Sequence, residues 1–348
     1  MIMEIERDSY REKVLFTARI ALTATILTFV VYHSFTWLLF IFAGVLVAIF
    51  FRGLSHFLAS KTPLSPSWSL AIVIFFIAAS SFLAWYFMAP AVIQQVNQLK
   101  DTFPHALNKL SEWSASYPWM RDYMQEINFD KVIRNGAGGA LLKATNFATT
   151  LLNGLVQIVL IIFIGLYFAV SPHTYINGFL ALIPNKKRGR VEEVLGKISR
   201  VLRWWLIGRF IDMAFIGSLI WLGLWLLDVP LALILAIIAG VLNFIPNIGP
   251  FLGAIPAILI GFTQGPDTVL WILILFTVIQ TLESVFTTPM VQQRAIHLPP
   301  GLTITSQIIL GAAFGTIGLA VATPLIAAII VAIKEFYVKD SLGNQVEN

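Results

Sequence analysis

The chain contains no cysteine and unusually few charged residues. Charged side chains make up 12% of its 348 residues, against about 25% in an ordinary soluble domain. Without cysteine it can form no disulfide, no thiolate metal site and no thiol nucleophile. The hydrophobic residues, 58% of the chain, occur in blocks long enough to cross a bilayer. A soluble protein with one large core is therefore excluded.

Several catalytic and nucleotide-binding motifs are also missing. The sequence has no GxxxxGK[ST] motif for a P-loop and no HExxH motif for an intramembrane zinc protease. Its five histidines are scattered, with no pair at the spacing of metal ligands. We expect no enzyme activity, no metal and no cofactor. A transporter driven by an existing gradient, or a passive permease, fits these absences.

The positive charge of the chain is concentrated in one loop between two apolar blocks. A net charge of +5 could indicate a nucleic-acid partner, but the placement of the basic residues argues against one. Basic loops are held on the cytoplasmic side of a membrane. The pattern predicts a multi-pass membrane protein with both termini in the cytoplasm. The basic residues of this loop are Lys186, Lys187, Arg188, Arg190, Lys197, Arg200, Arg203 and Arg209.

The apolar blocks predict an all-α polytopic membrane protein with about eight transmembrane segments. Its ordinary spans are predicted at residues 14–32, 35–51, 68–91, 147–170, 210–227 and 268–286. The predicted organisation is a charged N-terminal segment with three transmembrane helices (1–91), an extracytoplasmic helical segment (92–145), a fourth transmembrane helix (146–170), a cytoplasmic basic loop with an amphipathic helix (171–208), a transport core (209–338) and a cytoplasmic tail (339–348).

The amphipathic helix of the basic loop is predicted at residues 191–205. Its apolar residues share one face, and charged residues cover the other. Such a helix can lie among the lipid headgroups. It can equally pack under the helix bundle as an ordered connector, and the sequence leaves both arrangements open.

Two apolar blocks in the C-terminal half have a length that fits neither one membrane span nor two. Leu231–Phe262 and Leu302–Ile333 each contain 32 residues, too many for one untilted span and too few for two full spans. The first is interrupted at FIPNIGP (Phe244–Pro250), and the second at GAAFGTIG (Gly311–Gly318) and at Pro324. Each block is either one long kinked helix or a re-entrant hairpin of two half-spans. We favour the hairpins, because proline removes backbone donors and asparagine and glycine tolerate turns.

The first interruption is the leading candidate for a transport site. Non-helical backbone at membrane depth is tolerated where it is buried in protein or lines a water-filled cavity, and paired broken helices point to the substrate sites of transporters. A kink needed only for packing is the alternative. The candidate residues of this region are Asn243, Pro246, Asn247, Gly249, Pro250, Gly253 and Pro256.

Glu283 is the most informative acidic residue in an apolar block, because ionisable groups at membrane depth are costly and usually functional. Gln280 lies three residues earlier on the same helical face. We interpret Glu283 as a proton or cation acceptor or a gate in the transport pathway. The alternative is a structural carboxylate that bonds to Gln280 or to Arg294.

Arg209 and Asp212 stand three residues apart at the start of the fifth span and can pair with each other. We interpret them as an interfacial salt bridge, with Arg294 as a further member of a salt bridge or gate. Gln157 and Gln307 are expected to hydrogen-bond between helices.

Four stretches of the sequence resemble the autoinducer-2 exporter family of bacterial permeases. They are LNFIPNIGPFLGAIPAILIGF (Leu242–Phe262), the basic loop LIPNKKRGRVEEVLGKISRVLRWWLIGRF, VIQTLESVFTTPMVQ, and GTIGLAVATPLIAAI (Gly315–Ile329). The resemblance implies an inner-membrane protein with eight membrane segments that forms a homo-oligomer. Some members are linked to export of the quorum-sensing signal autoinducer-2, and others resemble sodium–proton antiporters.

Three functions follow as hypotheses. The first is a secondary transporter or exporter of a small polar solute, with its site at the broken helices and Glu283. The second is an Na⁺(Li⁺)/H⁺ antiporter in which Glu283 binds both the proton and the cation. The third is a non-transporting membrane scaffold. The expected partners are the lipid bilayer, a small polar solute with H⁺ or Na⁺ as further candidates, and other copies of this chain, but no nucleic acid.

Overall fold

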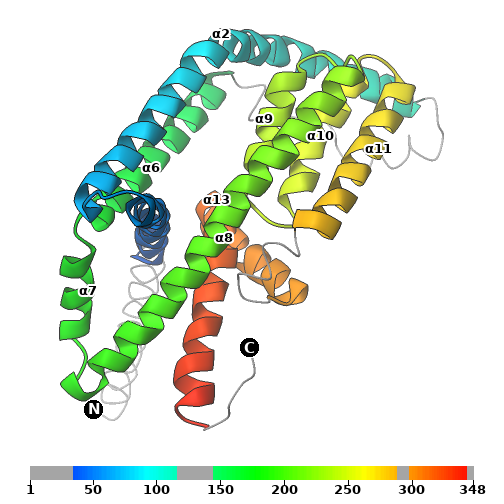
Figure 1. The fold of residues 1–348 in the computed structure, drawn as a ribbon. Coiled ribbons are helices and arrows are strands. Elements are labelled where there is room, and N and C mark those ends of the chain that lie inside the picture. Colours follow the sequence, from blue (N-terminus) through cyan, green and yellow to red (C-terminus); the bar gives the residue numbers. More distant parts are fainter. Residues whose placement is uncertain (1–33, 116–143, 288–297, 343–348) are drawn as a thin grey trace, which may run out of the picture.

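The computed structural model describes residues 34–115, 144–287 and 298–342. These residues form helices and short connections, with no strand among them (Figure 1). An all-α fold is therefore confirmed for the described chain. The helices are Ser34–Lys61, α2 (Pro66–Ala115), α6 (Ala144–Val170), α7 (Pro172–Ala181), α8 (Asn185–Leu226), α9 (Ala232–Leu242), α10 (Gly249–Gly261), α11 (Pro266–Leu282) and α13 (Pro300–Ala332), with the π-helical segments η1 (Glu283–Thr287) and η2 (Ile333–Lys339).

By length and composition alone, five of the described helices could cross a membrane, although one of them, Pro300–Lys339, is interrupted at Gly315. They are Ser34–Lys61, Pro66–Leu99, Asn185–Leu226, Pro266–Val285 and Pro300–Lys339. A sixth candidate is a pair of helices, Val156–Val170 and Pro172–Ala181, bent by 83° at Ser171. The described residues thus hold five or six candidate spans where the sequence predicted about eight segments. The predicted span at residues 14–32 lies outside them.

The block at residues 231–262 is a helical hairpin, as favoured from the sequence. Its arms α9 and α10 lie side by side in Figure 1, joined by a short non-helical turn. Both ends of the hairpin lie together, because Gln264 Nε2 donates to the Asp228 carbonyl at 2.8 Å. Asn247 takes a positive φ of 65° in the turn, a conformation that asparagine tolerates better than most residues. We call α9 and α10 the first hairpin.

The block at residues 302–333 also folds back on itself, at Gly315. Gly315 has φ 65° and ψ −144°, which no helix contains. Gln307 and Thr323 would lie about 24 Å apart along a straight helix, yet Gln307 Nε2 donates to Thr323 Oγ1 at 3.2 Å. The second arm continues through Pro324 without the break predicted there and ends in η2. We call residues 300–339 the second hairpin.

Helix α8 joins two segments that the sequence analysis treated separately. The amphipathic stretch 191–205 and the fifth span 210–227 form one continuous helix of 42 residues, which runs diagonally across the molecule in Figure 1. The apolar face of its first half is covered: Leu202 and Trp205 are buried in one cluster with Leu39 of the N-terminal helix and Val321 of α13. This favours the ordered connector over a helix that lies free among lipid headgroups.

Helix α2 reaches far beyond one membrane span and contacts the first hairpin. The segment after the third predicted span is helical to Ala115, as expected, and it forms one helix with that span. There Gln95 Oε1 accepts from the Ile234 backbone N–H at 2.9 Å, and Lys109 Nζ donates to the Thr263 carbonyl at 2.6 Å. These bonds satisfy an N–H at the start of α9 and a carbonyl beyond the end of α10, groups that helix ends leave open. The rest of the predicted extracytoplasmic segment, residues 116–143, lies outside the described residues.

Candidate functional site

An ion pair on α8 forms the centre of the candidate site. Arg209 and Asp212 lie three residues apart on the same face of the helix, and Arg209 Nη1 donates to Asp212 Oδ2. Their side chains are 11% and 2% exposed. The predicted pairing is present, but the pair is buried among helices. A buried ion pair at this depth needs further polar partners to offset its desolvation.

Asn243 supplies one of those partners from the first hairpin. It directly follows α9 at the start of the turn, and its side chain is fully buried. Asn243 Nδ2 donates to Asp212 Oδ2 at 2.9 Å. Because a carboxylate can only accept, the amide nitrogen of Asn243 must face Asp212. The turn of the first hairpin is thereby fixed to the ion pair on α8.

Glu283 approaches the same arginine from α11. It lies where α11 passes into η1, and π-helical turns of this kind are frequent at functional sites. Glu283 Oε1 is 3.8 Å from Arg209 Nη1, and Glu283 Oε2 accepts from Gln280 Nε2 at 2.9 Å. The predicted contact with Gln280 is thus present. Arg294, the other partner considered, lies outside the described residues.

Five predicted residues from α8, α9 and the α11–η1 junction therefore meet in one place. We call them the central cluster: Arg209, Asp212, Asn243, Gln280 and Glu283. Two carboxylates share one guanidinium, so the ionised cluster carries a net charge of −1. Three of its buried polar atoms, Arg209 Nε, Asp212 Oδ1 and Asn243 Oδ1, find no hydrogen-bond partner among the described residues. Such atoms are rare in folded proteins and mark sites of ligand binding or stored strain.

The prolines of the first hairpin define its turn. The Pro246 carbonyl accepts from the Ile248 N–H at 2.7 Å and from Gln307 Nε2 at 2.9 Å. Pro250 lies in the first turn of α10, where a missing N–H costs nothing, and Pro256 lies inside α10. Together with Asn247 these residues shape the backbone that carries Asn243 to the ion pair.

The two glycines of this region allow the arms of the hairpin to touch. A Cβ on Gly249 would come within 2.0 Å of the Leu242 carbonyl oxygen, and one on Gly253 within 2.8 Å of Ala239 Cα. Any larger residue would push α9 and α10 apart. In the structure Gly249 and Gly253 therefore position the site through packing.

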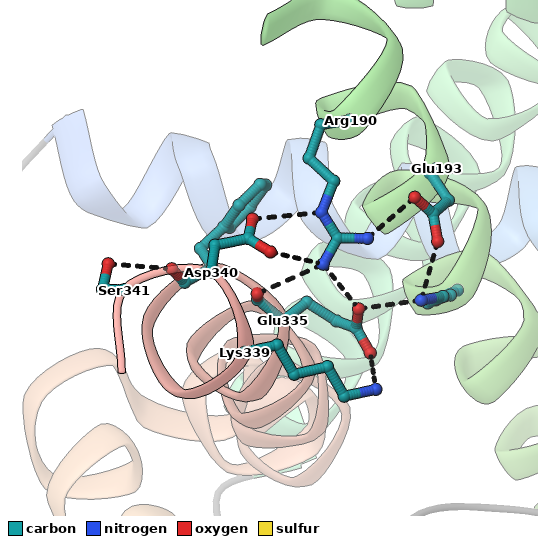
Figure 2. Close-up of polar contacts among 8 residues, drawn as sticks. Arg190, Glu193, Glu335, Lys339, Asp340 and Ser341 are labelled. Carbon is teal, nitrogen blue, oxygen red and sulfur yellow. Dashed lines mark hydrogen bonds and ion pairs between the residues drawn. The ribbon is translucent and has the colours of Figure 1, made fainter. Parts of the chain in front are cut away.

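A second charged group, which the sequence analysis did not predict, joins the start of α8 to the end of the chain. Figure 2 shows Arg190 between Asp340 and Glu335, with Lys339 against the other oxygen of Glu335. Arg190 Nη2 donates to Glu335 Oε2 at 2.9 Å, and Lys197 Nζ to the same oxygen at 2.8 Å. We call this group the α8–η2 clasp: Arg190, Glu193, Lys197, Glu335, Lys339 and Asp340. The sequence signal for it is a pair of acids, Glu335 and Asp340, shortly after the apolar block that ends at Ile333.

Comparison with known proteins identifies the family of this chain. Residues 20–338 match the family described as AI-2E family transporter. The chain belongs to this family. The match covers the first hairpin, residues 300–338 of the second and every residue of the central cluster, so the predicted family of membrane transporters is confirmed. The eight membrane segments that the resemblance implied stay a prediction, because the described residues hold five or six candidate spans.

Individual relatives carry similar descriptions. YueF of Bacillus subtilis (strain 168), provisionally named as a transport protein, is 27% identical over 335 residues, which cover 91% of this chain and 90% of that protein. PerM of Escherichia coli (strain K12), provisionally named as a permease, is 25% identical over 75% of this chain and 76% of its own. The AI-2 transport protein TqsA of Escherichia coli (strain K12) is 23% identical over 69% of this chain and 70% of its own.

Proposed function

We propose that this chain is a secondary transporter that exports a small polar solute across the bacterial inner membrane, with the central cluster as its binding site. The observation that carries the proposal is the set of three unpartnered buried atoms on Arg209, Asp212 and Asn243. They combine donor and acceptor chemistry beside a turn of non-helical backbone, where transporters of other folds bind their substrates. Family membership supports the transport class, and TqsA makes autoinducer-2 the first solute to test.

The proposed orientation has both chain termini in the cytoplasm. Its support is the concentration of basic residues between α7 and the middle of α8, since short basic loops stay on the cytoplasmic side. In this orientation the clasp lies on the cytoplasmic side and the polar end of α2 outside. The proposed assembly is a homo-oligomer, which is what the resemblance to the permease family implies.

The direct test is transport by purified protein in liposomes. We expect efflux of autoinducer-2, and we expect Asp212→Asn and Glu283→Gln each to lower the rate at least tenfold while the protein still inserts. Glu192→Gln is the matched control, because Glu192 is an exposed acid on the same helix as Asp212 and lies outside both charged groups. Equal rates in Asp212→Asn and Glu192→Gln would contradict a role for the central cluster.

Cation–proton antiport is the second candidate function. It is favoured by the central cluster, where two carboxylates lie beside one arginine, since a carboxylate can take up a proton or bind Na⁺. In this version Na⁺ flux depends strongly on pH, and Glu283→Gln abolishes that dependence. Measuring ²²Na⁺ and proton flux in the same liposomes separates it from solute export. Liposomes that move none of these probes while the protein retains a specific partner would point to the scaffold instead.

A further inference from the structure

Gln307 is an amide group buried between the two hairpins. It lies on the first arm of the second hairpin and is fully inaccessible to solvent. Its Nε2 donates to the Pro246 carbonyl at 2.9 Å, across 61 residues of sequence, and to Thr323 Oγ1 at 3.2 Å on the opposite arm of its own hairpin. A single side chain therefore joins the turn of the first hairpin to both arms of the second.

The orientation of this amide is fixed by its partners. The Pro246 carbonyl can only accept, so the nitrogen of Gln307 must face it. The oxygen, Oε1, then points elsewhere, and it finds no hydrogen-bond partner among the described residues. The neighbouring buried hydroxyls differ: Ser306 donates to the Thr303 carbonyl at 2.7 Å, and Thr303 to the Pro299 carbonyl at 3.4 Å. Gln307 alone of these three side chains keeps an open polar atom.

An open acceptor in an apolar block is unfavourable for folding. A buried polar atom that lacks a partner loses its hydration without compensation, and an apolar side chain of similar shape avoids this loss. Leucine would fit the composition of this block. The two bonds of Nε2 contribute to stability, but the open Oε1 does not, so we look for the role of this oxygen in function.

Gln307 contacts the same turn of the first hairpin that carries Asn243 of the central cluster. The turn of the first hairpin, residues 243–249, has the open atoms of Asp212 and Asn243 on the α8 side and the open oxygen of Gln307 on the side of the second hairpin. The α8 side is charged and the other side is neutral. Open polar atoms thus stand on both sides of one turn of non-helical backbone.

We propose that Gln307 is a substrate-binding residue, and that its Oε1 accepts from the hydroxyl or ammonium group of the transported solute or coordinates a cation, while Nε2 holds the hairpins together. This inference rests on the proposed transport function and extends its site to the second hairpin. The common chemistry of these ligands is a donor or positive charge that an amide oxygen can satisfy. Hydroxyl-bearing autoinducer-2 and Na⁺ represent the two sources.

The decisive variant is Gln307→Leu, because it separates a binding role from a structural one. Gln307→Leu removes the two hydrogen bonds that Nε2 donates to Pro246 and Thr323, so we expect a lower melting temperature for the unliganded protein. The binding role is measured as flux per folded molecule. If Gln307 binds the solute, its replacement lowers this flux about tenfold, through a raised KM, for whichever probe the wild type moves. Gln307→Glu keeps acceptor oxygens but loses the donor to Pro246, and we expect it to disturb the hairpin contact more. Gln157→Leu is the matched control, an exposed glutamine on apolar α6, and should change neither quantity.

The alternative outcomes are distinct. A Gln307→Leu protein that melts earlier and loses flux only in proportion to folded protein would make Gln307 structural and overturn the inference. Unchanged flux in Gln307→Leu together with lost flux in Asp212→Asn would overturn it and leave the proposed function intact. If the wild type moves no probe, binding is measured instead as a ligand-induced rise in melting temperature. A rise with autoinducer-2 or Na⁺ that is absent in Gln307→Leu supports binding without transport, and no rise in the wild type overturns the inference.

Discussion

Arg209 holds two carboxylates at unequal distances. It bonds directly to Asp212, whereas Glu283 Oε1 lies 3.8 Å away and bonds instead to Gln280 through its other oxygen. Asp212 is therefore the fixed counter-ion, and Glu283 is the carboxylate better placed to exchange partners. This asymmetry gives the two acids different roles, although both lie beside the same cation.

The asymmetry predicts an order of stability among variants. Arg209→Gln removes the cation that is bonded directly to the buried Asp212 carboxylate and should lower stability by about 3–5 kcal/mol. Asp212→Asn should cost less, because Glu283 remains as a counter-ion for Arg209. The double variant Arg209→Gln/Asp212→Asn should be more stable than Arg209→Gln alone, since it removes both members of the pair. Thermal unfolding of the purified protein measures all three, and an Asp212→Asn protein that melts below Arg209→Gln would contradict this account.

Gly249 offers a second prediction for a single residue. An added Cβ meets the backbone oxygen of Leu242 at 2.0 Å, and backbone cannot move aside as a flexible side chain can. Gly249→Ala should therefore lower stability by about 1–3 kcal/mol or more. Gly178→Ala in α7 is the control, because nothing lies within 4 Å of its added Cβ, and it should be neutral or slightly stabilising. Equal melting temperatures for the two variants would show that the arms of the hairpin separate easily.

The two hairpins are built alike although their sequences differ. Each turns at a residue with φ 65°, Asn247 in the first and Gly315 in the second. Each then brings a glycine against a carbonyl of the opposite arm: an added Cβ would lie 2.0 Å from Leu242 O at Gly249 and 2.1 Å from Leu310 O at Gly318. In a membrane the hydrophobic effect does not hold helices together, and small residues instead allow close van der Waals packing between them. Both hairpins thus use a glycine to bring their two arms into close contact.

The first hairpin makes a prediction about membrane topology. Asp228 and Gln264 flank it, are exposed, and are joined by a hydrogen bond. Because the native chain has no cysteine, single variants Asp228→Cys and Gln264→Cys each report one site. A membrane-impermeant maleimide should label both from the same side of sealed vesicles. Labelling from opposite sides would mean that residues 231–262 cross the membrane once, contrary to a re-entrant hairpin.

The breaks in the apolar blocks could be predicted from the sequence, but the direction of the chain after each break could not. Proline, asparagine and glycine in FIPNIGP mark where helical hydrogen bonds end, and the turn forms there. A block of 32 residues is compatible with a kinked helix as well as a hairpin. The fold-back is visible only in distant pairs such as Gln264 with Asp228 and Gln307 with Thr323, and single-sequence periodicity carries no information on such pairs.

The residues of the site could likewise be predicted singly but not as a group. Arg209 and Asp212 were paired from their spacing on one helix, and Gln280 and Glu283 from theirs. The link between the two pairs depends on how α8 and α11 pack against each other. This packing cannot be predicted from the pattern of apolar residues in either helix alone. Glu335 was missed because an acid after the last apolar residue is expected to face water, whereas packing of η2 on α8 buries it.

At the scale of the whole molecule, α8 connects the candidate site to the end of the chain. Its middle carries Arg209 and Asp212, and its first turns carry Arg190 and Lys197, which bind Glu335 at the end of the second hairpin. The same helix therefore holds Asn243 of the first hairpin and the base of the second. Gln307 then joins the two hairpins at the Pro246 carbonyl. These contacts close a ring of interactions that links the two hairpins through α8.

The contribution of the α8–η2 clasp to stability can be measured through its dependence on salt concentration. Glu335 is 6% exposed and accepts from Arg190, Lys197 and Lys339. Glu335→Gln keeps an acceptor but removes the charge, and it should lower stability by about 1–2 kcal/mol, or a few degrees in melting temperature. The partners of Glu335 are partly exposed, so their attraction is screened by salt. The difference between Glu335→Gln and wild type should therefore shrink between 0.05 and 1 M NaCl (roughly 14 to 3 Å in screening length).

Transport shows whether the clasp does more than stabilise the fold. If the ring of contacts couples the hairpins, Glu335→Gln alters the flux of the protein that remains folded, although Glu335 lies outside the central cluster. Glu192→Gln removes an exposed acid on α8 outside the clasp and should leave both melting temperature and flux unchanged. A Glu335→Gln protein with wild-type flux per folded molecule would restrict the clasp to stability. An altered flux that Glu335→Asp restores would assign to its charge a part in positioning the second hairpin.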